Sequence, residues 1–133
     1  MKRRLMCLAL SLFWLSACSP GTQLPSVTLD QARTAVEAGQ AVLIDIRESA
    51  EHAKGVAPGA RLLPMSQINQ RLNEIARAGG KPVYLICNTQ NRSQAVLGAL
   101  VEQGYRDVHF VQGGMSQWAQ RGWPLVAPAA ANP

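Results

Sequence analysis

Short runs of hydrophobic residues alternate along this chain with segments in which hydrophobic residues recur every three or four positions. The runs are continuous and are followed by polar residues, which is typical of strands buried on both faces of a parallel sheet. Strands are therefore predicted at residues 41–46, 82–86 and 108–111, with a shorter one at 61–63. Glycines punctuate the second pattern and indicate where its helices stop. The predicted helices run from residue 28 to Gly39, from 65 to Gly79 and Gly80, and from 93 to 103, ahead of Gly104.

The order of these elements predicts the fold class. Strands that alternate with helices indicate an α/β layered domain whose central sheet is mostly parallel. In such a domain a ligand binds beyond the carboxyl ends of the strands. A chain of 133 residues is long enough for one domain with a sizeable core, and we expect it to be a monomer.

A cysteine, Cys87, ends one of the buried strands and is followed by five hydrophilic residues before the next helical pattern. Backbone N–H groups of such a loop converge on the sulfur, and the helix N-terminus adds about half a positive charge, so the thiolate is favoured over the thiol. Arg92 adds a full positive charge. The alternative is a small buried cysteine that ends a core strand. The polar residues count against it, because their backbone donors need a partner. The candidate site consists of Cys87, Asn88, Thr89, Gln90, Asn91, Arg92 and Ser93.

This loop resembles the active-site loop of the rhodanese family, single-domain sulfurtransferases whose cysteine carries a persulfide. Other segments resemble the family's motifs and follow in its order. They are the strand ending in Asp-x-Arg at 42–48, Glu51 with the Gly-Val-Ala-Pro-Gly-Ala loop at 55–60, and the closing segments at 111–118 and 122–124. The resemblance covers residues 26–126. It implies a three-layer α/β domain with helices on both sides of the sheet, and a sulfurtransferase that needs no cofactor and carries sulfur on Cys87.

Three positions depart from the family's pattern. Gln90 stands where many members have glycine, at a point where the backbone can need a positive φ, so we expect either a strained loop or a different turn. On that basis, replacing Gln90 by glycine is expected to raise turnover of thiosulfate. Val56 and Ala57 stand where the family has His and Ile, away from the sulfur, which indicates divergence without loss of the chemistry.

Asp45 and Arg47 end the strand beside the loop and are supporting candidates. They form either a structural ion pair that holds the neighbouring loop or part of a substrate site, and both readings stay open. His52 and His109 are isolated in the sequence. Because neither has Cys, His or Asp at ligand spacing, we expect no metal site.

Three other function classes compete with sulfur transfer. Phosphatases and arsenate reductases with a similar scaffold have five residues between Cys and Arg, which enlarges the ring of N–H donors to hold an oxyanion. Here four residues separate Cys87 from Arg92, which suits a sulfur atom attached to the cysteine. A membrane-anchored docking module, in which Cys87 is incidental, is the principal alternative. A thiol redox protein is disfavoured because the mature chain would offer no resolving cysteine.

The N-terminus has the pattern of a secretory signal peptide. The pattern consists of basic residues at 2–4, an apolar stretch at 5–15 and a cleavage site of small residues. The apolar stretch is too short to span a membrane. The Leu-Ser-Ala-Cys ending at 15–18 resembles the bacterial lipobox, which implies that Cys18 is acylated and anchors the protein in the cell envelope, facing the periplasm. Ser19 in place of aspartate favours the outer membrane. The alternative is an ordinary secretory signal that contains a cysteine.

Removal of this signal would change the charge of the protein. The formal net charge would fall from +5 to +2, because three of the 13 basic residues lie at 2–4. No basic run would remain, so nucleic acid is not an expected partner. The expected partners are a small-molecule or protein sulfur donor, a thiol acceptor, and the membrane through Cys18. The expected organisation is a lipoprotein signal peptide at 1–17, a lipidated tether at 18–26, the rhodanese-like domain at 27–126 and a disordered tail at 127–133.

Overall fold

Five parallel strands form the centre of the molecule, in the order β1-β5-β4-β2-β3. The structure is a computed structural model that describes residues 21–76 and 79–131, so the predicted signal peptide and Cys18 lie outside the described residues. The strands are β1 (Ser26–Val27), β2 (Val42–Asp45), β3 (Arg61–Leu62), β4 (Val83–Ile86) and β5 (Val108–Val111). The helices are α1 (Leu29–Glu37), α2 (Ser49–His52), the 3₁₀ helix η1 (Met65–Gln70), α3 (Leu72–Ala76), α4 (Asn91–Glu102), α5 (Gly114–Gln120) and α6 (Pro128–Ala131).

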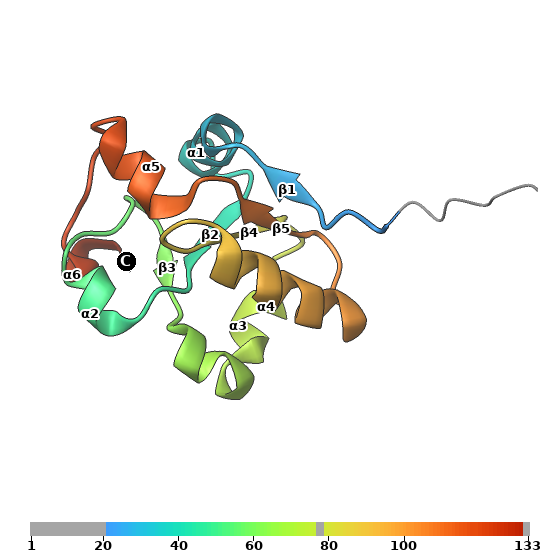
Figure 1. Cartoon of the computed structure of the whole chain (residues 1–133). Helices are drawn as coiled ribbons and strands as arrows, with labels where there is room; N and C mark the ends of the chain where they lie inside the picture. The colour runs from blue at the N-terminus through green and yellow to red at the C-terminus, as the bar shows by residue number, and fades with distance from the viewer. Residues whose placement is uncertain (1–20, 77–78, 132–133) are drawn as a thin grey trace, which may run out of the picture.

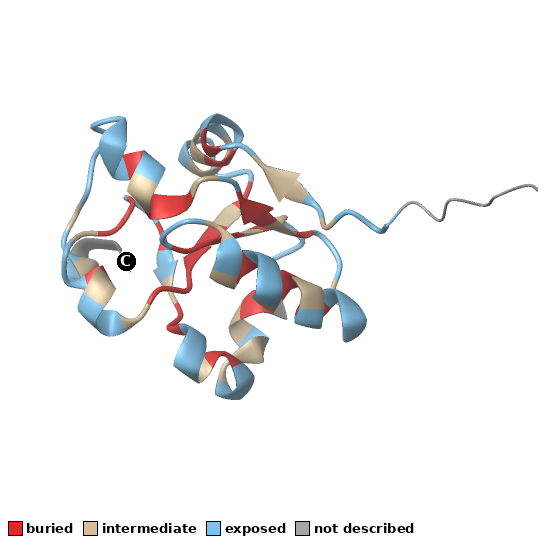
Figure 2. Cartoon of the chain, in the orientation of Figure 1, coloured by how far each residue is buried: buried red, intermediate tan, exposed pale blue. Residues whose placement is uncertain are grey.

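Helices cover both faces of the sheet (Figure 1). Helices α1 and α5 lie on one face, and η1, α3 and α4 lie on the other. Each layer encloses its own cluster of buried hydrophobic side chains. Figure 2 shows the buried residues concentrated along the sheet and on the helix surfaces that face it. This three-layer arrangement around an all-parallel sheet confirms the predicted fold class.

Neighbouring residues of one strand pack into different layers. In β2, Leu43 joins the cluster under α1 and α5, whereas Ile44 joins the cluster under α3 and α4. In β4, Ile86 and Leu85 divide in the same way. Because successive side chains point to opposite faces, a strand covered on both sides is apolar at every position. The continuous runs therefore predicted these strands to within one residue at each end.

The predicted helix from residue 65 to the two glycines is divided in the structure. The 3₁₀ helix η1 ends before Arg71, whose φ of −126° interrupts the helical backbone, and α3 follows. The Arg71 guanidinium donates a hydrogen bond of 3.2 Å to the carbonyl of Leu62 in β3. This contact holds the break against the sheet. Hydrophobic spacing continues across Arg71, so the local pattern carried no sign of the division.

Besides α5 (Gly114–Gln120), three shorter elements lie where the sequence predicted none. Strand β1 pairs with β5, with Ser26 opposite Phe110, whereas the sequence predicts a tether up to Ser26. Helix α2 follows β2, and α6 occupies residues 128–131, where a disordered tail was predicted. Elements of two to four residues are too short to show a period. None of the helices within residues 21–76 and 79–131 is both long and apolar enough to cross a membrane.

Candidate active site

Cys87 lies at the carboxyl edge of the sheet, immediately after β4. Strand β4 is the middle strand, between β5 and β2. Its hydrogen bonding to β2 continues one residue beyond the end of β2, where the Ile46 N–H donates to the Ile86 carbonyl at 2.9 Å. The chain then turns through residues 88–90 into α4. A parallel sheet brings its ligand-binding loops together at this edge. The thiol therefore lies where the strand prediction placed it.

The sulfur of Cys87 contacts the first turn of α4. The Ser93 N–H donates to Cys87 Sγ over 3.4 Å, and Ser93 Oγ lies 3.4 Å from the same sulfur. Ser93 Oγ also donates to the Gln90 carbonyl at 3.0 Å. The single hydroxyl proton of Ser93 goes to the Gln90 carbonyl, so Ser93 Oγ can accept from the Cys87 thiol while the Ser93 N–H donates to the sulfur. The sulfur therefore has two polar contacts with Ser93, although Cys87 is only 1% exposed.

The carbonyl groups of the loop are held by the beginning of α5. The Met115 N–H donates to the Cys87 carbonyl and the Ser116 N–H to the Asn88 carbonyl, both at 2.8 Å. In a planar trans peptide the N–H points opposite to the C=O, so the N–H groups of Asn88 and Thr89 face away from α5. Within the described part of the chain these two N–H groups have no protein acceptor. They are donors available to a bound anion or to a sulfur atom.

The backbone at Gln90 avoids the strained positive φ and adopts a different turn. Its φ is −166°, which is extended backbone that any residue adopts, so glycine is not needed here. The side chain has a contact of its own, because Gln90 Oε1 accepts a hydrogen bond of 3.1 Å from the Gly113 N–H. Gln90 thus ties the loop to the residue before α5.

Arg92 does not present a free positive charge to the sulfur. Its two terminal nitrogens donate to the two carboxylate oxygens of Glu51, each at 2.7 Å. The pair links α4, which contains Arg92, to α2, which contains Glu51. Glu51 Oε2 also accepts from the Glu48 N–H at 3.0 Å, which fixes the start of α2. Sequence reasoning identified Glu51 only as part of a family motif. Its role as the partner of Arg92 was missed, since the two residues are 41 positions apart.

The bidentate pair changes the acidity of its carboxylate. The hydrogen bonds from Arg92 lower the pKa of Glu51 from its ordinary 4.5 to about 2. A carboxylate whose pKa falls on folding stabilises the folded protein at pH values above its pKa in the unfolded chain. This stabilisation is lost as the pH drops towards the pKa in the folded protein. The pair therefore supports the site above about pH 4.5 and loses this contribution progressively towards pH 2. At neutral pH, Arg92 and Glu51 are both charged.

The comparisons with known proteins agree with this geometry. The rhodanese-like domain model matches residues 28–121. The chain belongs to the rhodanese family. A sulfurtransferase of Allochromatium vinosum is 40% identical over 87 residues, which are 65% of this chain and 79% of that protein. The uncharacterized protein YqhL of Bacillus subtilis is 40% identical over 79 residues, 59% of this chain and 61% of that protein. The crystal structure of a rhodanese-like domain protein from Staphylococcus aureus is 30% identical, with a TM-score of 0.66 over 78% of this chain and 98% of its own.

In this rhodanese domain, Asp45 and Arg47 form a buried ion pair. Arg47 Nη2 lies 2.7 Å from Asp45 Oδ2 and donates to the Gly55 carbonyl at 2.9 Å. His52 Nε2 is buried and lies 3.4 Å from Asp45 Oδ1. The two atoms do not have the angles of a hydrogen bond. These contacts join the end of β2 to α2 and the loop after it. They favour the structural reading of Asp45 and Arg47 over contact with a substrate.

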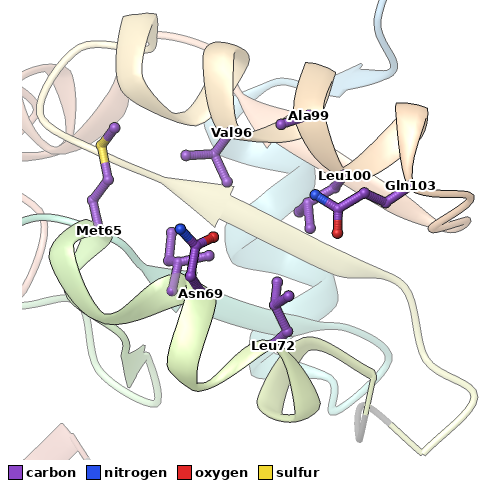
Figure 3. A pocket seen from close by; sticks show the side chains of 8 residues that line it. Met65, Asn69, Leu72, Val96, Ala99, Leu100 and Gln103 are labelled. Atoms are coloured by element: carbon purple, nitrogen blue, oxygen red, sulfur yellow. The ribbon is translucent and has the colours of Figure 1, made fainter.

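An apolar groove of the rhodanese domain lies apart from Cys87 (Figure 3). It has a volume of about 150 Å³ and runs between α4 and the η1–α3 segment. Val96 points into it from α4, and Met65 and Leu72 from the opposite side. Met65 is exposed. No residue of the 87–93 loop lines this groove, so the candidate chemistry lies in the loop and not in the groove.

Proposed function

We propose that this rhodanese domain is a sulfurtransferase that carries sulfane sulfur as a persulfide on Cys87. The observation that carries the proposal is the set of donors around one thiol at the carboxyl edge of the sheet. The Ser93 N–H contacts the sulfur, and the N–H groups of Asn88 and Thr89 face away from α5 without an acceptor. Such donors stabilise an anionic sulfur in the same way that they stabilise other anions.

The proposed reaction has two displacement steps. The Cys87 thiolate attacks the outer sulfur of the donor, a new S–S bond forms, and the donor's S–S bond breaks with its electron pair leaving on sulfite, a sulfinate or a thiolate. A thiol or cyanide acceptor then attacks the terminal sulfur, and the S–S electron pair returns to Cys87 as thiolate. Sulfur is transferred without an external oxidant or reductant. Asn88, Thr89 and Asn91 are exposed and form the outer rim that a donor meets first.

Mass spectrometry of the protein tests this proposal directly. After incubation with a sulfane-sulfur donor, the wild-type chain should gain the mass of one sulfur atom on the peptide that contains Cys87. Addition of cyanide should remove that mass and release thiocyanate. Cys87→Ser should neither gain the mass nor catalyse transfer, because no group remains to hold the sulfur. A wild-type chain that never gains sulfur would instead favour the docking module.

A further inference from the structure

The active loop contains one cationic residue, and that residue is already bound to a carboxylate. Arg92 is the only Lys or Arg within residues 87–93. Its Nη1 lies 2.7 Å from Glu51 Oε2, and its Nη2 lies 2.7 Å from Glu51 Oε1. Two parallel charge-assisted hydrogen bonds make this the strong, geometrically specific form of an ion pair. The pair is about one third exposed on each side, so it lies at the surface that a donor approaches.

A second carboxylate lies at the same end of α2. Glu48 precedes the helix, and its two carboxylate oxygens accept from the Ser66 N–H at 3.0 Å and from Ser66 Oγ at 2.9 Å. Neither bond comes from a cation, and no ion pair of the described residues includes the Glu48 carboxylate. Arg47 is in turn paired with Asp45. The Arg92–Glu51 pair has no net charge, so the loop's cation offers no net attraction to an anion, and Glu48 adds a carboxylate at the start of the same helix.

We propose that Glu51 determines the charge of the sulfur donor, and that this site uses donors with one negative charge or none in preference to the thiosulfate dianion. The inference rests on the proposed function. A dianion gains no attraction from an Arg92 that Glu51 already neutralises, and the Glu51 carboxylate repels a dianion more than it repels a donor with less charge. A donor with less charge, such as a thiosulfonate or an alkyl persulfide, meets less repulsion and still finds the loop N–H groups.

Two donors of nearly the same shape isolate the charge. Methanethiosulfonate has a methyl group in place of one oxygen of thiosulfate and carries one negative charge instead of two. With thiosulfate, Cys87 takes the outer sulfur and sulfite leaves with the S–S electron pair. With methanethiosulfonate, methanesulfinate leaves in the same way. The number of sulfur atoms and electrons transferred is equal, so the comparison depends on charge and on the intrinsic reactivity of each donor.

The experiment measures kcat/KM for both donors with the wild type, E51Q and E37Q. Glutamine at position 51 keeps an oxygen that can accept from the Glu48 N–H but removes the charge that neutralises Arg92. We expect E51Q to raise kcat/KM for thiosulfate by about tenfold relative to methanethiosulfonate, the size of one charge-assisted hydrogen bond gained by the dianion. Taking this ratio between variants cancels the intrinsic reactivities. E37Q removes a carboxylate from the Arg33–Glu37 pair on α1 and should leave the ratio unchanged.

A second measurement begins with the wild type alone. In the wild type, kcat/KM for thiosulfate should stay level or rise as ionic strength increases, since salt screens repulsion between like charges. The same argument applies to alkylation of Cys87. We expect the anionic reagent iodoacetate to react more slowly than the uncharged reagent iodoacetamide, and we expect E51Q to reduce this difference in rate. A steep fall of thiosulfate turnover with salt, or an unchanged donor ratio in E51Q, would overturn the inference.

Failure of the inference and failure of the proposed function give different results. If neither donor places sulfur on Cys87, the sulfurtransferase proposal is wrong, whereas the two alkylating reagents still report the charge at the loop. If kcat/KM for thiosulfate is high and falls steeply as salt is added, the sulfur-transfer proposal stands and the role given to Glu51 is wrong.

Discussion

Gln90 joins two parts of the site that are distant in the sequence. Its side chain reaches the Gly113 N–H at 3.1 Å, and its carbonyl accepts from Ser93 Oγ, which lies against the sulfur. Because its φ is −166°, glycine would relieve no strain at this position. The expectation that glycine improves the loop therefore reverses in the light of the structure.

We predict that Gln90→Ala and Gln90→Gly both lower sulfur transfer severalfold and do not raise it. Each leaves the Gly113 N–H without its acceptor, which costs about 1 kcal/mol in unfolding free energy, and glycine also adds backbone freedom to the unfolded chain. Chemical denaturation and donor kinetics measure the two effects. Gln94→Ala is the matched control, because Gln94 is an exposed glutamine of α4. Faster thiosulfate turnover in Gln90→Gly would restore the expectation drawn from the sequence.

At the scale of elements, the start of α5 supports the 87–93 loop. Gly114 has a φ of +61°, and a Cβ at this position would collide with the carbonyl oxygens of Cys87, Asn88 and Thr89. Only a residue without a side chain lets the two segments approach so closely. The close approach allows Met115 and Ser116 to hold the loop carbonyls. Loop geometry thus depends on an element that follows it by more than twenty residues.

We predict that Gly114→Ala destabilises the protein by at least about 3 kcal/mol and abolishes most of the sulfur transfer, because both the positive φ and the collision disfavour it. Gly122→Ala is the matched control. Gly122 also has a positive φ, +65°, but nothing lies within 4 Å of its Cβ position. That variant should lose only about 1–2 kcal/mol, the cost of the backbone conformation. Similar losses of melting temperature in both variants would contradict the role of the close approach.

At the scale of the whole molecule, the first strand lies at the edge of the sheet. Strand β1 pairs with β5, where the Phe110 N–H donates to the Pro25 carbonyl at 3.1 Å. The active loop lies at the carboxyl ends of the strands. We propose that the preceding segment anchors the domain to a bacterial membrane through Cys18, which lies outside the described residues.

We predict that Cys18→Ala moves the protein from the membrane fraction to the soluble fraction. The Leu-Ser-Ala-Cys sequence at 15–18 supplies the acylation site, and lipid chains supply the binding energy. Sulfur transfer by the released protein should equal that of the wild type, since Cys87 is unchanged. Cys87→Ser should remain in the membrane fraction and serves as the matched cysteine control. A wild-type protein that is already soluble would show that the signal is an ordinary secretory one.

The sequence by itself determined four of the five strands and the place of the thiol. Continuous apolar runs mark strands buried on both faces, and Cys87 directly follows one of them, so adjacency in the chain was enough. The tertiary structure alone decided what surrounds that thiol. Arg92 finds Glu51 across 41 positions, and Gln90 finds Gly113 across 23. Contacts of this kind leave no periodic trace in the sequence, because they depend on how the sheet brings its loops to one edge and not on the spacing of hydrophobic residues.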